Sequence, residues 1–205
     1  MPAQSLSTEA FVLLKRPPSE SFQGFVLFSS EHGVLQTQQR LAKKKTAKSP
    51  ALDLFDEAGF TLESSNQGRT WFVKEVVLTT RHAGVGRSYE ALRLASALGA
   101  LVARNAVPEE GRRPVAALLR AAFAAFATGV RPDIVWFKGL YVFARDEGYP
   151  LKQQWLPTLP AADRTAVAAL LNLPLAAQTA APALVAQFTR RLEDYLRGET
   201  EILLD

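Results

Sequence analysis

The segment from Arg40 to Lys48, with the sequence RLAKKKTAK, carries five cationic side chains in nine residues. Between Glu31 and Asp53 no carboxylate interrupts it. Lys and Arg displace condensed counterions from polyanions such as nucleic acids, so an uninterrupted basic segment predicts phosphate binding. The alternative is a solvated loop that serves only solubility.

The other residues that could do chemistry form no catalytic pattern. His32 and His82 are the only histidines and cysteine is absent, which leaves too few ligands for a typical zinc site. The adjacent acids Asp56 and Glu57 fall at an expected turn, where we interpret them as solvated caps. Gly84-Val85-Gly86 lacks the remaining residues of a dinucleotide or P-loop motif, so we expect a pliable joint there. We therefore expect no enzyme, no catalytic residue, no metal and no cofactor.

Composition is that of a globular protein with a mild positive charge. The chain has 205 residues, 48% of them hydrophobic, and 24 cations against 20 anions give a net charge of +4. This charge suits an acidic partner. The start, MPAQSLSTEA, lacks the features of a secretion signal, and the longest apolar run, 121–130, is too short to span a bilayer. We expect a cytoplasmic protein that makes no contact with membranes.

The first eighty residues have the pattern of short strands separated by turns. Strands are expected over 10–16, 22–29, 34–39 and 71–78, with a further apolar segment over 52–62. Five short strands with one longer connection predict a small closed barrel of the oligonucleotide-binding (OB) type, although an SH3-like barrel would use the same strands.

From Arg87 onward the apolar residues recur with a helical period. A first helix is expected from about Tyr89 to Pro108, and others over 114–126, 134–145, 161–171 and 182–196. We expect Pro114 to open the second helix and Gly198 to cap the last. The predicted fold class is α+β, with a five-stranded OB-type β-barrel over 1–80 followed by an all-α helical bundle over 81–205.

Four aromatic residues on the expected strands are candidates for base stacking: Phe25, Phe28, Trp71 and Phe72. Side chains alternate across a strand, so one of each neighbouring pair should point outward. An outward ring beside a cationic segment would be a stacking platform for single-stranded bases. The alternative is that the helical half covers them.

Both halves of the chain resemble a known family, the N-terminal half in its motifs and the helical half mainly in its layout. The runs A-F-V-L-L-K-R, S-E-S and F-V-L-F-S-S-E-H-G-V-L resemble the start of the bacterial recombination mediator RecO, with its hairpin at Leu27 to Gly33. Lys48-Ser49 closes the basic segment as a Lys-Ser pair does in that family, and Ser88 to Leu92 falls where the family's first bundle helix begins.

Two departures from the family pattern stand out. The basic segment has no glycine within Lys43-Lys44-Lys45, and the four zinc-binding cysteines of many members, around the equivalent of 148–160, are absent. The chain is also shorter than typical members. It resembles the zinc-free members. In this chain we expect Gly148-Tyr149-Pro150 and Trp155-Leu156-Pro157 to brace the region instead of zinc.

The resemblance implies a non-enzymatic DNA-repair and recombination protein. Such proteins bind single- and double-stranded DNA, anneal complementary strands, engage the acidic C-terminal tail of single-stranded DNA-binding protein and work with RecR to load RecA. The competing interpretation is a protein-interaction scaffold whose OB-like barrel has lost nucleic-acid binding.

Two sets of residues are candidates for these contacts. The cations expected to bind DNA are Lys15, Arg16, Arg40, Lys43, Lys44, Lys45, Lys48 and Arg69. A hydrophobic groove edged by cations, for the partner tail, is expected at Arg112, Arg113, Leu119, Arg120 and Phe123.

Overall fold

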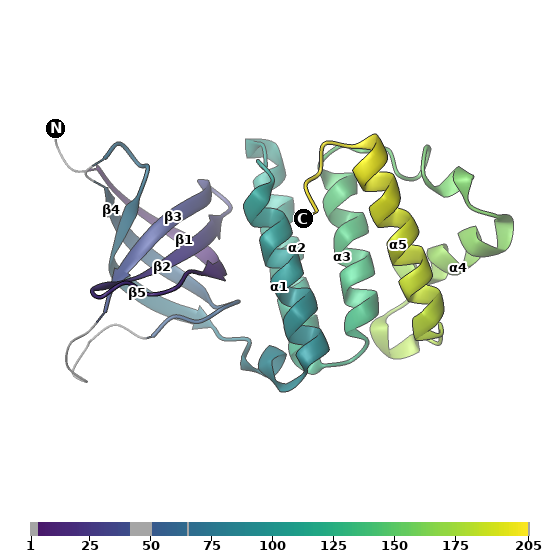
Figure 1. Cartoon of the computed structure of the whole chain (residues 1–205), viewed down its shortest axis with the longest axis horizontal. Helices are drawn as coiled ribbons and strands as arrows, with labels where there is room; N and C mark the ends of the chain where they lie inside the picture. The colour runs from purple at the N-terminus through teal and green to yellow at the C-terminus, as the bar shows by residue number, and fades with distance from the viewer. Residues whose placement is uncertain (1–3, 42–50, 65, 205) are drawn as a thin grey trace. The chain divides into compact units, whose positions relative to one another are not determined.

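The computed structural model describes residues 4–41, 51–64 and 66–204. The chain divides into two compact units (Figure 1). The first holds the chain up to His82 together with 102–116, and the second holds 83–101 and 117–205. The expected boundary at residue 80 lies two residues from the observed change. The 102–116 segment, expected in the helical half, groups with the barrel instead.

Five strands form the barrel of the first unit (Figure 1). They are β1 (Gln4–Lys15), β2 (Phe22–Ser29), β3 (Gly33–Arg40), β4 (Glu57–Ser64) and β5 (Trp71–Thr80). The barrel closes in the order β1-β2-β3-β5-β4, with β4 paired again to β1. All pairings are antiparallel except that of β3 with β5. This arrangement, followed by helices, confirms the predicted α+β class with its five-stranded barrel.

The strand β1 begins at Gln4, earlier than the predicted residue 10, because two neighbouring strands pair with different parts of it. Its first part pairs with β4 and its second part with β2, and the register of the second pairing shifts between Val12 and Leu14. The strand β4 begins at Glu57 rather than at 52, because the chain before it turns at Phe55, whose φ is 68°. Inward-facing apolar residues fill the barrel, including Val12, Phe25, Leu27, Leu35, Phe60, Leu62 and Trp71.

The helices are α1 (Tyr89–Arg104), α2 (Glu109–Thr128), α3 (Pro132–Asp146), α4 (Ala161–Asn172) and α5 (Pro182–Glu199). Short 3-10 helices lie at Ala83–Arg87, Leu156–Thr158 and Leu175–Ala177. Two expected boundaries are wrong. Pro114 lies inside α2, which already begins at Glu109, where two acidic residues in the first turn favour a helix N-terminus. Gly198 lies inside α5, which continues to Glu199.

The helix α3 packs against α5 and also contacts α4 in the second unit (Figure 1). Its buried residues cover most of its circumference, as expected of a central helix. After it, Trp155 is buried against the rings of Phe137 and Tyr141, with centroid distances of 6.4 and 6.2 Å. This aromatic packing holds the chain that follows α3 against that helix.

Gly84 lies where the second unit brings two backbone segments together. A Cβ atom at this position would overlap the carbonyl oxygen of Ala127, near the end of α2. The same test at Gly86 meets no atom within 4 Å. The expectation of a pliable joint is therefore wrong at Gly84, where a close backbone approach requires the glycine.

Candidate nucleic-acid interface and cationic pocket

The cations expected to bind DNA are only partly covered by the structure. Lys43, Lys44, Lys45 and Lys48 lie outside the described residues. The other four, Lys15, Arg16, Arg40 and Arg69, are all exposed. Lys15 lies 3.5 Å from the carboxylate of Asp53, and both side chains are open to solvent, so the pair is weak.

Arg16 and Arg40 lie on one face of the barrel. The backbone N–H of Arg16 donates to the carbonyl of Gly24 on β2, and its Nη2 donates to Oε1 of Gln36 on β3 at 3.2 Å. Arg40 is the last residue of β3 and pairs with Phe22 on β2. The basic segment therefore begins on this face, at Arg40, whereas Arg69 belongs to the turn before β5.

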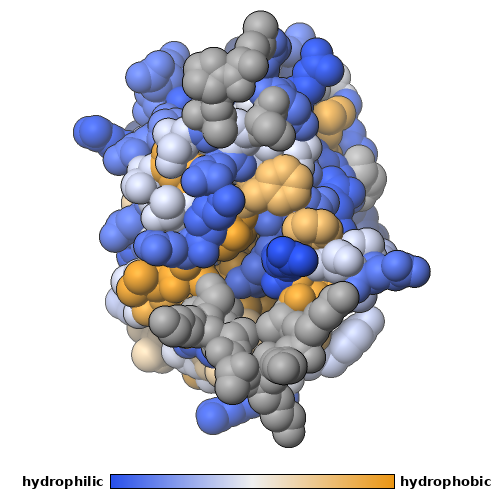
Figure 2. Space-filling model, turned by 90° about the vertical axis from the view of Figure 1, so that its left-hand side faces the viewer, coloured by the Kyte–Doolittle hydropathy of each residue, from blue (hydrophilic) through white to orange (hydrophobic). Residues whose placement is uncertain are grey.

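Of the four candidate stacking residues, one reaches the surface. Phe25, Phe28 and Trp71 are buried, whereas Phe72 is half-buried on the outside of the barrel. Phe72 meets the half-buried ring of Phe22 edge to face, with a centroid distance of 5.7 Å and an interplanar angle of 67°. Figure 2, which views the structure from the left-hand side of Figure 1, shows apolar residues exposed among hydrophilic ones.

Phe22 was not singled out from the sequence. The signal that could have found it is strand alternation, since Phe22 lies an odd number of residues from Phe25 and Leu27, which face the barrel core.

The residues expected to form the partner-tail groove are divided between the two units and between core and surface. Leu119 and Phe123 are completely buried, so this part of the prediction is wrong: both side chains belong to the core of the second unit. Arg112 belongs to the first unit, where its Nη1 donates to the carbonyl of Glu31 at 2.8 Å. Arg113 and Arg120 are exposed.

The interpretation of Asp56 and Glu57 as solvated caps is also wrong. Both side chains are buried, and Asp56 accepts two hydrogen bonds from Arg81, which follows β5. These carboxylates also lie near His82. Burial lowers the pKa of His82, while Glu57 and Asp56 act in the opposite direction. This cluster joins the start of β4 to the end of β5 within the barrel unit.

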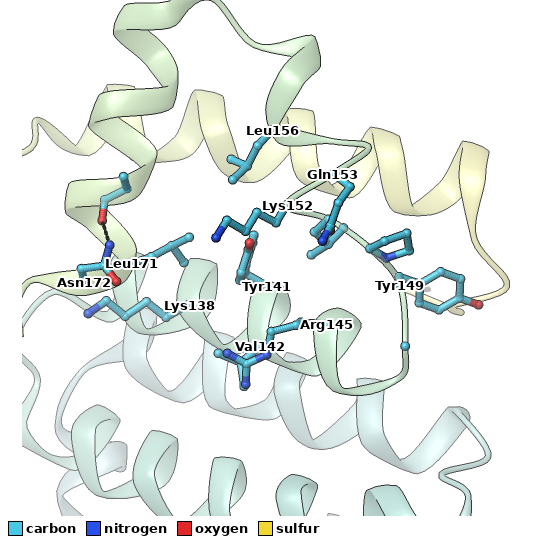
Figure 3. Close-up of a pocket in the computed structure, with 14 residues that line it drawn as sticks. Lys138, Tyr141, Val142, Arg145, Tyr149, Lys152, Gln153, Leu156, Leu171 and Asn172 are labelled. Atoms are coloured by element: carbon cyan, nitrogen blue, oxygen red, sulfur yellow. Dashed lines mark hydrogen bonds between the residues drawn. The ribbon is translucent and has the colours of Figure 1, made fainter.

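The second unit has a concave site, which we call the cationic pocket, with a volume of about 660 Å³ between α3, the chain from 148 to 156, and α4. Three cations line it: Lys138 and Arg145 from α3, and Lys152 from the connecting chain (Figure 3). Of the described residues that line it, none is Asp or Glu. Tyr141, Val142, Leu156 and Leu171 supply aromatic and apolar walls. Such a site suits a ligand with both acidic and apolar groups.

The three cations of the pocket differ in their contacts with the rest of the chain. The ammonium of Lys138 donates to the carbonyl of Leu173 at 2.7 Å, and burial lowers its pKa. Arg145 pairs with Asp146 at 2.7 Å. Lys152 is exposed. The sequence analysis did not identify this pocket, because its lining residues come from three separate segments.

A second, smaller cavity of about 190 Å³ adjoins the first. It shares Lys138 and Val142 with the larger cavity and is otherwise lined by apolar residues and glycine from α2, α3 and Leu175. Cations line the first cavity and mainly apolar residues line the second, and both cavities lie against α3.

Among the described residues, no group of three His, Asp or Glu side chains is placed to hold a metal ion. None of the helices in the described ranges is long and apolar enough to cross a membrane. The sequence matches no protein-family model and no curated protein.

Proposed function

We propose that this chain is a recombination mediator of the RecO type, which binds single- and double-stranded DNA, anneals complementary strands and assists RecA loading with a RecR-like partner. The observation that supports this most is the course of β3. This strand of an OB-type barrel ends at exposed Arg40, beside Arg16, and continues into the basic segment. Charge and fold thus favour the same kind of ligand.

Annealing would need no proton transfer. Two complementary strands repel each other through their phosphates, and Lys and Arg side chains reduce this repulsion by replacing counterions. Contacts to phosphates carry no base sequence, so one surface can hold either strand. Exposed cations without a catalytic group are sufficient for such a mechanism.

A salt titration tests the proposal. If about four cations contact phosphates, the logarithm of the affinity for single-stranded DNA should fall against the logarithm of salt with a slope near −3, at about −0.7 per contact. Replacing Lys43, Lys44 and Lys45 with Gln should flatten the slope by about 2. Arg190→Gln, an exposed change on α5, is the control and should leave the slope unchanged.

An unchanged slope in the triple variant would return the basic segment to the role of a solvated loop. A wild-type chain that binds neither single- nor double-stranded DNA would favour the scaffold alternative.

We also propose that the acidic tail of single-stranded DNA-binding protein binds the cationic pocket, rather than the residues around Leu119 and Phe123. The pocket offers cations for the acidic residues, and the adjoining cavity offers an apolar site for the terminal side chains. Separate charged and apolar sites are what a peptide of mixed character requires.

The peptide Asp-Asp-Asp-Ile-Pro-Phe is the probe for the tail proposal. Fluorescence anisotropy should show binding that weakens with salt and is lost in Lys152→Glu, while Arg120→Glu should bind as the wild type does. The opposite pattern would place the tail on α2. Absence of binding at tens of micromolar would reject the tail proposal and leave the DNA proposal standing.

A further inference from the structure

We propose that Phe22 and Phe72 form a base-stacking platform on the outer face of the barrel, which favours single-stranded nucleic acid over duplex. This inference rests on the proposed DNA-binding function and adds to it the form of the ligand. It needs only residues of the first unit that the structure describes.

Strand register places the platform residues on one face. Phe22 on β2 is opposite Arg40 on β3, and Gln38, two residues before Arg40, is aligned with Phe72 on β5. Directly paired residues, and residues two apart on a strand, point to the same side of a sheet. Phe22, Gln38, Arg40 and Phe72 therefore lie on the outside together, while Thr37 and Trp71 point inward.

The two rings are held in place before any ligand arrives. Their edge-to-face contact at 5.7 Å fixes each against the other, and both remain partly exposed. They project from strands of a closed barrel, which hold side chains more firmly than loops do. A base could stack on the platform without ordering the protein first.

The surroundings of the platform are cationic and polar. Arg40 and Arg16 can contact phosphates on either side of a stacked base, and Gln36 and Gln38 offer amides for base edges or sugars. Gly24 lies between Arg16 and Gln38 and has no side chain to cover this part of the face. A Cβ at this position would lie 3.3 Å from Cβ of Arg16. The carboxylate aligned with Phe72, that of Glu63, is paired with Lys74 at 2.7 Å.

A duplex could not use the rings in the same way. Its bases are already stacked on each other, so it would offer this face only its phosphates. Unpaired bases expose their faces and can stack on aromatic side chains with little regard to sequence. The rings would therefore add affinity for single strands alone.

The test compares three ligands of equal length: an oligo-dT strand, an abasic strand with the same phosphates, and a duplex. The full chain should bind oligo-dT more tightly than the abasic strand. Phe72→Ala and Phe22→Ala should each weaken binding of oligo-dT by about 5- to 100-fold. Their affinity for the abasic strand and the duplex should stay at the wild-type level.

Two further variants distinguish loss of the aromatic ring from misfolding of the barrel. Phe72→Leu retains apolar packing but removes the ring and should behave as Phe72→Ala, whereas Phe72→Tyr retains the ring and should bind oligo-dT as the wild type does. Equal losses for all three ligands, or no loss in Phe72→Leu, would overturn the platform.

The outcomes also separate this inference from the function on which it rests. Salt-dependent wild-type binding that is equal for oligo-dT and the abasic strand would leave the DNA-binding function intact and reject the platform. Binding to none of the three ligands would reject both.

Discussion

Arg81 holds both carboxylate oxygens of Asp56, with Nε 3.0 Å from Oδ1 and Nη2 2.7 Å from Oδ2. The Asp56 side chain is 1% exposed and that of Arg81 is 43% exposed. Oδ2 of Asp56 also accepts the backbone N–H of Asp53, and Nη2 of Arg81 donates to the carbonyl of Ala51. The pair thereby fixes the chain that leads into β4 against the end of β5.

Arg81→Gln should lower the free energy of unfolding by about 3 kcal/mol, because it leaves a buried carboxylate without its cation. Urea unfolding measures the loss. Lys15→Gln is the matched control: its ion pair with Asp53 is exposed, so the change should stay within about 0.5 kcal/mol. Equal effects of the two substitutions would show that the Asp56 pair contributes no more than a surface contact.

Gly84→Ala should destabilise the chain by about 2 kcal/mol, because the new methyl group can be accommodated only if the backbone at Ala127 moves. Gly86→Ala, two residues later, meets open space and serves as the control. Thermal unfolding of both variants decides the point. A melting temperature for Gly84→Ala as high as that for Gly86→Ala would mean that the close approach is not needed for folding.

The stability of the chain should depend on pH through His82. Burial lowers its pKa in the folded state below the value of 6.5 expected when it is unfolded. Between these two values the unfolded chain binds more protons, so the free energy of unfolding should fall as the pH drops below about 6.5. Above that pH the contribution of His82 is constant.

His82→Gln should reduce this slope between about pH 5.5 and 6.5, a window above the ordinary pKa of carboxylates. His32→Gln, at an exposed turn residue, should retain it. Urea titrations at several pH values give the slopes. An identical slope in wild type and His82→Gln would assign the pH dependence to other groups.

Chelator treatment should leave the melting temperature unchanged, because the chain has no cysteine and the region around Trp155 packs through aromatic rings. Elemental analysis of the purified protein provides the independent measurement. One tightly held zinc ion per chain would contradict the prediction and call for a search for an enzymatic site.

Local signals were sufficient for much of the fold. The strand β2 has the predicted bounds, since Pro17-Pro18 and the Ser30 to Gly33 turn delimit it in the sequence. Alternation also predicted that one of Trp71 and Phe72 points outward. Helix ends were harder to predict, because Pro114 is tolerated inside α2 and Gly198 inside α5.

The features that were missed depend on partners far away in the sequence. Asp56 resembles a turn residue until Arg81, 25 positions later, is brought beside it. The cationic pocket needs Lys138, Lys152 and Asn172 from different segments. Leu119 and Phe123 have the spacing of a groove floor, but the same spacing serves a helix that buries its apolar face.

The parallel seam between β3 and β5, at Thr37 with Trp71 and Gln38 with Phe72, closes the barrel. The aromatic platform crosses it, with Phe72 on one side and Phe22 and Arg40 on the other. A strand of nucleic acid bound across the platform would stabilise the closed barrel, since β3 and β5 could not separate without releasing the strand. Ligand affinity and barrel opening would then be one linked equilibrium.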